Sequence, residues 1–148
     1  MLQVGFYLNN YTRTVDVTSA LGKLYYGGNE ANLAAALRLV RSHVFTTHNG
    51  ARVGDRQVAK LAVVFTENRS SNLTATLAEA TATRKAGIGI VTVGIGTAVD
   101  PYELSAVASY PNYHTMFQAD RLSNLSTVSD PIKRIICRGI NSLCQHLV

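Results

Sequence analysis

The chain has 148 residues, of which 47% are hydrophobic and 16% are charged. A chain of this length and composition can bury a core within a single globular domain. Its apolar runs fall short of the roughly 18 to 20 residues that a membrane-spanning helix needs, and its first ten residues lack the basic start and apolar centre of a signal peptide. We therefore expect no membrane insertion and find no export signal.

The net charge of +5 would favour acidic partners only if the basic side chains gathered on one face. In the sequence they are scattered, and no aromatic interleaving, zinc-ligand spacing or helix-turn-helix pattern accompanies them. Two small basic groups stand out: Arg52, Arg56 and Lys60, and Lys133, Arg134 and Arg138. This distribution predicts solvated basic faces and no nucleic-acid partner.

The first third of the chain predicts one strand and two helices. Residues Gln3–Leu8 alternate as an edge strand does, and Asn9–Thr12 is turn material. A short helix fits Val15–Leu24, and apolar residues recur at helical spacing over Leu33–Phe45. Between these helices Tyr25–Asn29 breaks the chain, and a polar, glycine-containing loop follows over Thr46–Asp55.

The middle of the chain predicts a strand, a helix and a second strand, over Ala59–Thr66, Leu73–Lys85 and Ile88–Ile95. Both strands are apolar runs without alternation, which is typical of strands buried on both faces of a parallel sheet. Ligands bind such sheets at the carboxyl ends of the strands. Glu67 and Asn68 follow the first of these strands, and we expect them at that edge.

The last third predicts two helices with a strand between them. Asp100-Pro101 supplies an N-cap and a proline in the first helical position, starting a helix that runs through Ser109. A short strand is predicted over Tyr113–Gln118 and a loosely amphipathic helix over Leu122–Ile136. The whole order predicts an α/β fold with an open, mostly parallel sheet between helices.

Glycine pairs at Gly87-x-Gly89 and Gly94-x-Gly96 provide the main alternative, a small nucleotide-binding or regulatory domain. Neither pair completes Gly-x-Gly-x-x-Gly between a strand and a helix, so tight turns and close packing are the preferred interpretation. The four histidines, His43, His48, His114 and His146, have no Cys, Asp or Glu at ligand spacing. Since no nucleophile elbow or His-Glu-x-x-His motif appears, we predict that the chain is not an enzyme.

Taken in order, these segments resemble the von Willebrand factor A domain, the fold also found as the inserted domain of integrins. The resemblance is carried by Phe6–Tyr11, Tyr26-Gly27-Gly28, Phe45–Arg52, Val63–Asn68, Val93–Gly96 with Glu103-Leu104, and Ala108-Ser109. It is nearest to extracellular-matrix and collagen-associated members. It implies a three-layer, Rossmann-like domain over residues 1–137, followed by a C-terminal tail over residues 138–148.

The family's first strand carries an Asp-x-Ser-x-Ser motif, and a helix and a second strand follow it. This chain has no counterpart to these elements, so the resemblance implies a partial domain, truncated at its N-terminus. The family's sheet order is 3-2-1-4-5-6, in which the two missing strands would join the edge strand to the rest. An open sheet of this kind leaves backbone groups unpaired, and self-association through it is one expected consequence. A fragment without function of its own is another interpretation.

The family's metal site uses the Asp-x-Ser-x-Ser oxygens, a threonine after the Gly-Gly and the aspartate that ends the fourth strand. Here Ala31 stands at the threonine position and Glu67 at the aspartate position. The glutamate carboxylate lies farther from the backbone than an aspartate carboxylate by one carbon–carbon bond, about 1.5 Å. Mg²⁺ demands near-octahedral oxygen coordination. We therefore expect no cofactor and a degenerate, non-functional metal-ion-dependent adhesion site, with Mg²⁺ bound only if the missing motif is supplied.

The resemblance implies a non-enzymatic protein–protein interaction or adhesion module that is extracellular and binds matrix or cell-surface proteins. We expect its contact surface at the carboxyl-end rim, formed by Asn29, Glu30, Asn32, Glu67, Asn68 and Arg69. Four glycosylation sequons begin at Asn10, Asn68, Asn72 and Asn124. Cys137 and Cys144 could pair with each other, pair elsewhere or stay as thiols, and their spacing leaves these alternatives open.

Overall fold

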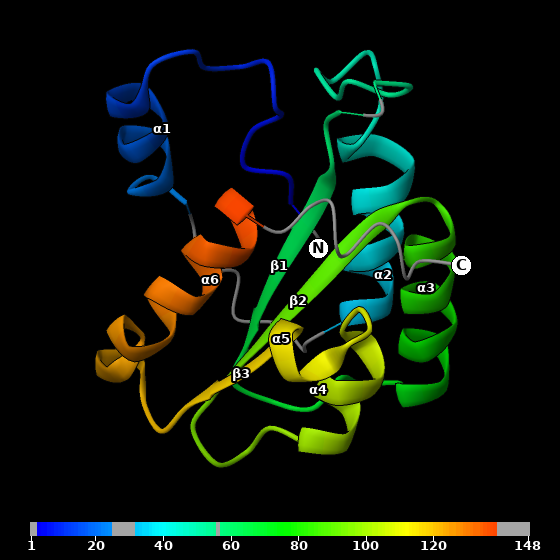
Figure 1. The fold of residues 1–148 in the computed structure, drawn as a ribbon, viewed down its shortest axis with the longest axis vertical. Helices are drawn as coiled ribbons and strands as arrows, with labels where there is room; N and C mark the ends of the chain where they lie inside the picture. Colours follow the sequence, from blue (N-terminus) through cyan, green and yellow to red (C-terminus); the bar gives the residue numbers. More distant parts are fainter. Residues whose placement is uncertain (1–2, 25–31, 56, 139–148) are drawn as a thin grey trace.

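The computed structural model describes residues 3–24, 32–55 and 57–138 of the chain. Their core is a three-stranded parallel sheet in the order β1-β2-β3, formed by β1 (Lys60–Thr66), β2 (Ile88–Ile95) and β3 (Met116–Ala119). Lys60 pairs with Ile88 at one end of the first ladder, and Thr92 pairs with Met116 at the start of the second. Helices cover both faces of the sheet, so the predicted α/β fold with a parallel sheet is confirmed (Figure 1).

The remaining elements follow in chain order. They are α1 (Thr14–Leu21), α2 (Leu33–Leu39), the π-helical turn η1 (Val40–Val44), α3 (Leu73–Lys85), α4 (Pro101–Val107), α5 (Asn112–Thr115), the 3₁₀ turn η2 (Leu122–Asn124) and α6 (Ser126–Arg138). Within the described residues, no helix is long and apolar enough to cross a membrane.

The two faces of the sheet bury separate apolar clusters because successive residues of a strand point to opposite sides. On one face, Ile90 of β2 packs with Leu37 of α2, Ala80 of α3 and Val107 of α4. On the other face, Val91 and Val93 pack with Val128 and Ile132 of α6. β2 is therefore the centre of the molecule, and all eight of its residues are buried.

Most of the predicted elements are confirmed. The bounds of α3 and β2 are those predicted, and β1 begins one residue later than expected. The helix predicted over Leu33–Phe45 begins at Leu33 but changes to a π-helical turn after Leu39. The last predicted helix divides into η2 and α6. The boundary between residues 137 and 138 stays a prediction, since residues 139–148 lie outside the described part.

One strand prediction was wrong, and a second strand is present but begins later than predicted. Residues 3–8 contain no strand; Asn9 Nδ2 instead donates to His48 O at 3.0 Å, so this segment lies against the turn that follows η1. Alternation alone cannot make a strand, because a strand also needs a partner for its backbone groups. The strand predicted over Tyr113–Gln118 begins only at Met116, since residues Asn112–Thr115 form the short helix α5.

The expectation that β1 is buried on both faces is also wrong. Its residues are half-buried, and Phe65 is 56% exposed. In the described chain β1 pairs with β2 alone, so its outer edge has no neighbouring strand. A groove of about 490 Å³ lies against this strand, and its apolar lining includes Leu8, Phe45, Leu61, Val63 and Ile136. Among the described residues, the open edge and the groove therefore both lie on β1.

Candidate functional site

The loop after β1 presents three of the predicted rim residues to solvent. Glu67, Asn68 and Arg69 are all exposed, at the carboxyl end of the strand. Thr66 Oγ1 donates to the backbone O of Asn68 at 2.7 Å, which bends the chain away from the strand. The structure thus brings Glu67, Asn68 and Arg69 together at the edge where an open α/β sheet binds ligands.

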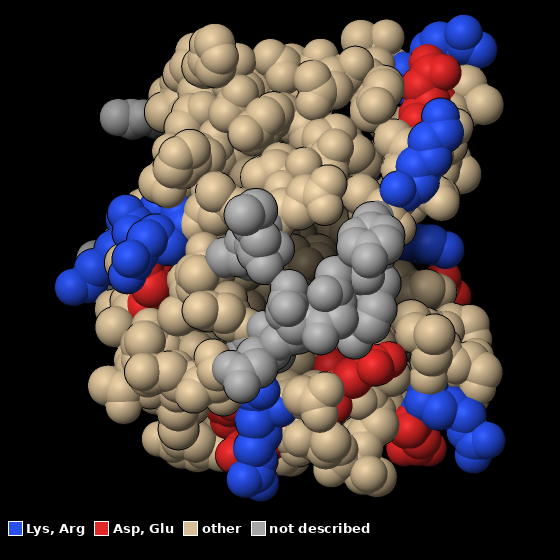
Figure 2. Space-filling model, turned by 180° about the vertical axis from the view of Figure 1, so that it is seen from behind, with Lys and Arg blue, Asp and Glu red and all other residues tan. Residues whose placement is uncertain are grey.

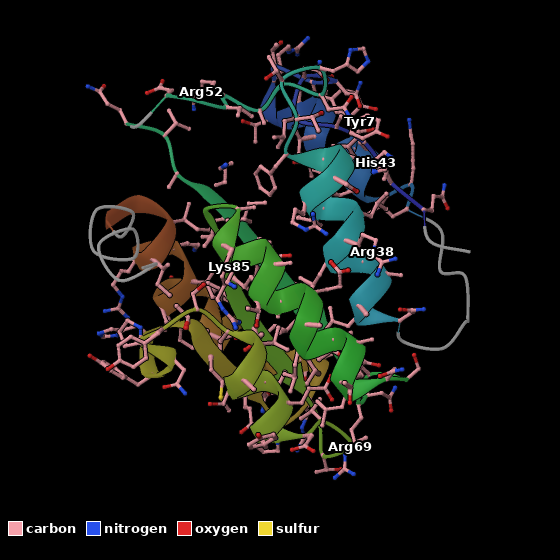
Figure 3. The ribbon with its side chains drawn as sticks, turned by 90° about the vertical axis from the view of Figure 1, so that its right-hand side faces the viewer. Tyr7, Arg38, His43, Arg52, Arg69 and Lys85 are labelled. Carbon is pink, nitrogen blue, oxygen red and sulfur yellow. The ribbon has the colours of Figure 1, made fainter. Side chains whose placement is uncertain are left out.

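A second loop, which leads from β2 into α4, joins this rim. Arg69 Nε lies 3.8 Å from the Asp100 carboxylate, which also accepts from Tyr102 N at 2.9 Å as the N-cap of α4. The Arg69 side chain is 71% exposed, so the pair is a weak, solvent-screened contact. Figure 3 shows Arg69 at the opposite end of the molecule from Arg52.

Glu103, a buried residue of α4, links the two loops through hydrogen bonds. This residue is only 6% exposed, and both of its carboxylate oxygens lie 3.2 Å from Ser70 N, which donates to them. A buried carboxylate is stable only when hydrogen bonds replace its water. Sequence reasoning singled out Glu103 for the family resemblance and missed this role, because Ser70 and Glu103 are 33 positions apart.

The other predicted rim residues divide into two groups. Asn32 is the N-cap of α2, and its side-chain oxygen accepts from Ala35 N at 2.9 Å. Asn29 and Glu30 lie outside the described residues, as does Ala31, the residue at the family's metal-site threonine position. Cys144 and the side chain of Cys137 also lie outside the described part, so the state of the two thiols stays a prediction.

The carboxylates at the rim are a poor match for the family's metal site. Asp100 is engaged with Tyr102 N and Arg69, and the buried Glu103 is engaged with Ser70 N, which leaves Glu67 with the most accessible carboxylate. Among the described residues, no three His, Cys, Asp or Glu side chains gather in a group that could hold a metal ion. The described residues of the rim therefore do not by themselves supply the set of oxygen ligands that an octahedral Mg²⁺ site needs.

The glycine pairs have structural roles in turns and packing. Gly87 and Gly96 adopt positive φ angles of 72° and 80° at the two ends of β2, a conformation that glycine favours. A Cβ at Gly94 would lie 2.5 Å from Leu104 Cδ1, and one at Gly89 would lie 3.0 Å from Leu61 Cδ1. These contacts account for glycine at each position without a bound phosphate.

An ion-pair cluster joins α2 to α3 outside the rim. Glu79 accepts from Arg38 at 2.8 Å and from Arg41 at 3.0 Å, and Figure 3 shows Arg38 on the helix beside α3. The hydrogen bond from Arg41, followed by that from Arg38, lowers the pKa of Glu79 below its usual value. On the face drawn in Figure 2, Lys and Arg side chains stand in separate groups, most with Asp or Glu beside them.

Arg84 makes a different kind of contact, with the C-terminal end of α4. Its Nη1 donates to the carbonyl oxygens of Ala106, Val107 and Ala108 at 3.1, 2.6 and 3.4 Å. Burial lowers the pKa of Arg84. The guanidinium satisfies carbonyls that a helix end leaves without partners.

Comparison with known proteins assigns the chain to a family. The model for the von Willebrand factor type A domain matches residues 2–131. The chain belongs to the von Willebrand factor type A family. As a VWA domain it is 29% identical to matrilin-2 of Mus musculus over 91% of the chain, and 30% identical to mouse matrilin-4 over 89%. It is also 28% identical to mouse integrin alpha-X over 90% of the chain.

Solved structures agree on the VWA fold. Proximal thread matrix protein 1 from the mussel byssus superimposes with a TM-score of 0.83 and 22% identity, covering 91% of this chain and 34% of that one. At this identity the likeness shows the fold alone. The VWA domain spans 14% and 21% of the length of the two matrilins, so it corresponds to a small part of each relative.

Proposed function

We propose that this VWA domain is a non-enzymatic, extracellular module that binds matrix or cell-surface proteins through its carboxyl-end rim. The observation that carries the proposal is the exposed Glu67–Arg69 loop at the carboxyl end of β1, in a domain whose relatives include matrilins and collagen VI chains. Exposed polar side chains on a loop held by a buried sheet are the usual arrangement of a contact surface.

We further infer that this contact does not depend on a metal ion. A structure of the mussel byssus protein is described as having a zinc-occupied MIDAS motif, which is the metal-ion-dependent adhesion site. In this chain the rim carboxylates of Asp100 and Glu103 are engaged with protein donors, and Glu67 stands where the family has the shorter aspartate. We therefore propose that the charged side chains of Glu67 and Arg69 contact the partner protein in place of a metal ion.

The test is binding of the purified chain to a solubilised extracellular-matrix extract, with Mg²⁺ or with a chelator. Arg69→Ala is expected to weaken binding by about tenfold, as for a residue central to an interface. Arg52→Ala is the matched control, because Arg52 is an exposed arginine at the opposite end of the molecule. Binding that disappears with chelator would overturn the metal-independent contact, and equal loss in both variants would overturn the rim as its site.

The free edge of β1 supports the proposal that the domain is incomplete in this chain. Within the described residues, β1 pairs on one side only, carries an exposed phenylalanine and lies beside an apolar groove. An edge of this kind can accept a further strand. The family's strand order implies that further strands pair there. We propose that added strands complete the sheet, and that copies of the chain associate when those strands are missing.

A further inference from the structure

The sequon that begins at Asn72 lies at the start of α3, where the Asn72 side chain is the N-cap of the helix. Asn72 is exposed and extended, with φ of −148° and ψ of 97°, and its Oδ1 accepts from Ala75 N at 2.9 Å. This bond is an N-cap, which stabilises a helix by about 1 kcal/mol. The cap uses the amide oxygen, and the amide nitrogen, Nδ2, takes no part in it.

The Asn10 sequon has the same division of roles at the other end of the molecule. Asn10 is exposed in a turn, and its Oδ1 accepts from Tyr7 N at 2.6 Å. Figure 3 shows Tyr7 at the end of the molecule opposite Arg69. Both asparagines are therefore held by their oxygen atoms, on the surface, at opposite ends.

The other two sequons lie in more restricted surroundings. Asn124 is half-buried within η2. Asn68 is exposed, but the third residue of its sequon, Ser70, is half-buried, with its N–H on the buried Glu103 carboxylate at 3.2 Å. A glycan is bulky and must remain in solvent. Asn10 and Asn72 satisfy this requirement without disturbing a buried contact.

We propose that Asn10 and Asn72 carry N-linked glycans, and that the glycan on Asn72 limits access to the rim. This inference rests on the proposed extracellular function and deepens it. The donor is a lipid-linked oligosaccharide pyrophosphate. A C–N bond forms between Nδ2 and the anomeric carbon of the first sugar, the sugar–phosphate bond breaks, and the lipid pyrophosphate leaves as Nδ2 loses one proton.

The modified amide keeps its carbonyl oxygen, so the cap to Ala75 N is retained after the transfer. Asn72 follows Arg69 by three residues, on the same loop as Glu67 and Asn68. A branched sugar attached there shields the Glu67–Arg69 loop from a large partner. A glycan on Asn10, at the far end of the molecule, leaves that loop open.

The first experiment measures site occupancy. The full chain is secreted from cultured cells behind an added signal peptide, with a reporter sequon appended at the C-terminus. Peptide-N-glycosidase hydrolyses the side-chain amide that carries the glycan and so converts each glycosylated Asn to Asp, and peptide mass spectrometry locates the change. We expect conversion at Asn10 and Asn72. An unmodified Asn72 in molecules whose reporter sequon is glycosylated would overturn the proposal.

Two substitutions separate the glycan from the cap. Thr74→Ala removes the sequon and keeps Asn72 as the cap, so it should abolish the Asn72 glycan without lowering the midpoint of thermal unfolding by more than a few degrees. Asn72→Asp also removes the acceptor nitrogen but keeps an oxygen for Ala75 N. A glycan that persists at Asn72 in the Thr74→Ala variant would contradict the assignment.

The second experiment measures binding to the solubilised matrix extract. Thr74→Ala should bind about threefold or more tightly than the glycosylated parent, whereas Thr12→Ala, which removes the Asn10 glycan, should bind as the parent does. Equal binding by all three would overturn the shielding. If Asn72 is found glycosylated but protein from which the glycans have been removed still fails to bind, the modification stands and the rim contact is wrong.

Discussion

At the scale of single residues, two threonines of α3 bury hydroxyl groups that lack hydrogen-bond partners among the described residues. Within the described residues, the hydroxyls of Thr76 and Thr83 are fully buried and have no hydrogen-bond partner. An unsatisfied polar group in the interior costs about 1 to 3 kcal/mol. Thr76→Val should therefore raise the free energy of unfolding in urea by about 1 kcal/mol. Thr92 is the control, because its buried hydroxyl donates to Leu104 O at 3.0 Å, and Thr92→Val should lower stability.

Gly94 tests the packing interpretation of the glycine pairs at the same scale. A Cβ at this position would lie 2.5 Å from Leu104 Cδ1 and 3.1 Å from Val99 Cγ2, both in the buried core. Gly94→Ala should lower the free energy of unfolding by about 1 to 3 kcal/mol, as overpacking does. Gly22→Ala is the control, since Gly22 has a φ of −66° and a Cβ there would have Ser19 O, at 3.6 Å, as its nearest neighbour. Equal effects would contradict the close packing of α4 on β2.

At the scale of the elements, Glu79 joins α2 to α3, and its contribution should depend on pH. Because its folded pKa is lowered, the contribution is present above the unfolded value near 4.5 and is lost as the pH falls through the lower folded value. Arg38 is 67% exposed and Arg41 33%, so screening limits the pair to about 1 kcal/mol. Glu79→Gln should lower the free energy of unfolding by that amount at neutral pH.

The pH dependence of this difference is the decisive measurement. The gap between the parent and Glu79→Gln should shrink as the pH falls below the unfolded value near 4.5 and through the lower folded pKa, because the carboxylate then becomes protonated. Asp130→Asn is the control, because the Lys133–Asp130 pair is 71% and 76% exposed and should contribute little. A gap that stays constant with pH would assign the effect of Glu79 to packing instead of charge.

At the scale of the whole molecule, the open edge of β1 sets the expectation for cooperativity. Among the residues that the structure describes, β1 is a half-buried edge strand beside an apolar groove. We expect the 148-residue chain to unfold in urea with a slope below the roughly 1 to 3 kcal/mol/M typical of complete small domains, and to associate as concentration rises. Circular dichroism and sedimentation would measure both properties.

The same titration tests the metal site. Added Mg²⁺ should leave the unfolding midpoint unchanged, because a ligand raises stability only if it binds the folded state. A shift with Mg²⁺ would restore the metal-dependent adhesion site. A steep, cooperative transition from a monomer would contradict the proposal that further strands complete the sheet.

The sequence alone determined the central part of the fold. The apolar runs of β1 and β2 and the helix α3 between them were predicted with bounds correct to one residue, because local periodicity and N-caps specify such elements. The order of segments also determined the family, which the match over residues 2–131 confirms. Exposure of the Glu67–Arg69 loop followed from its position at the carboxyl end of a parallel strand.

Only the tertiary structure decided which segments find partners. Residues 3–8 have the alternation of a strand but form none, since a ladder requires a second strand that no local pattern supplies. The bonds from Ser70 N to Glu103 and from Arg38 to Glu79 join residues 33 and 41 positions apart. Such contacts depend on how helices pack against the sheet, and the burial they produce is a property of the assembled layers.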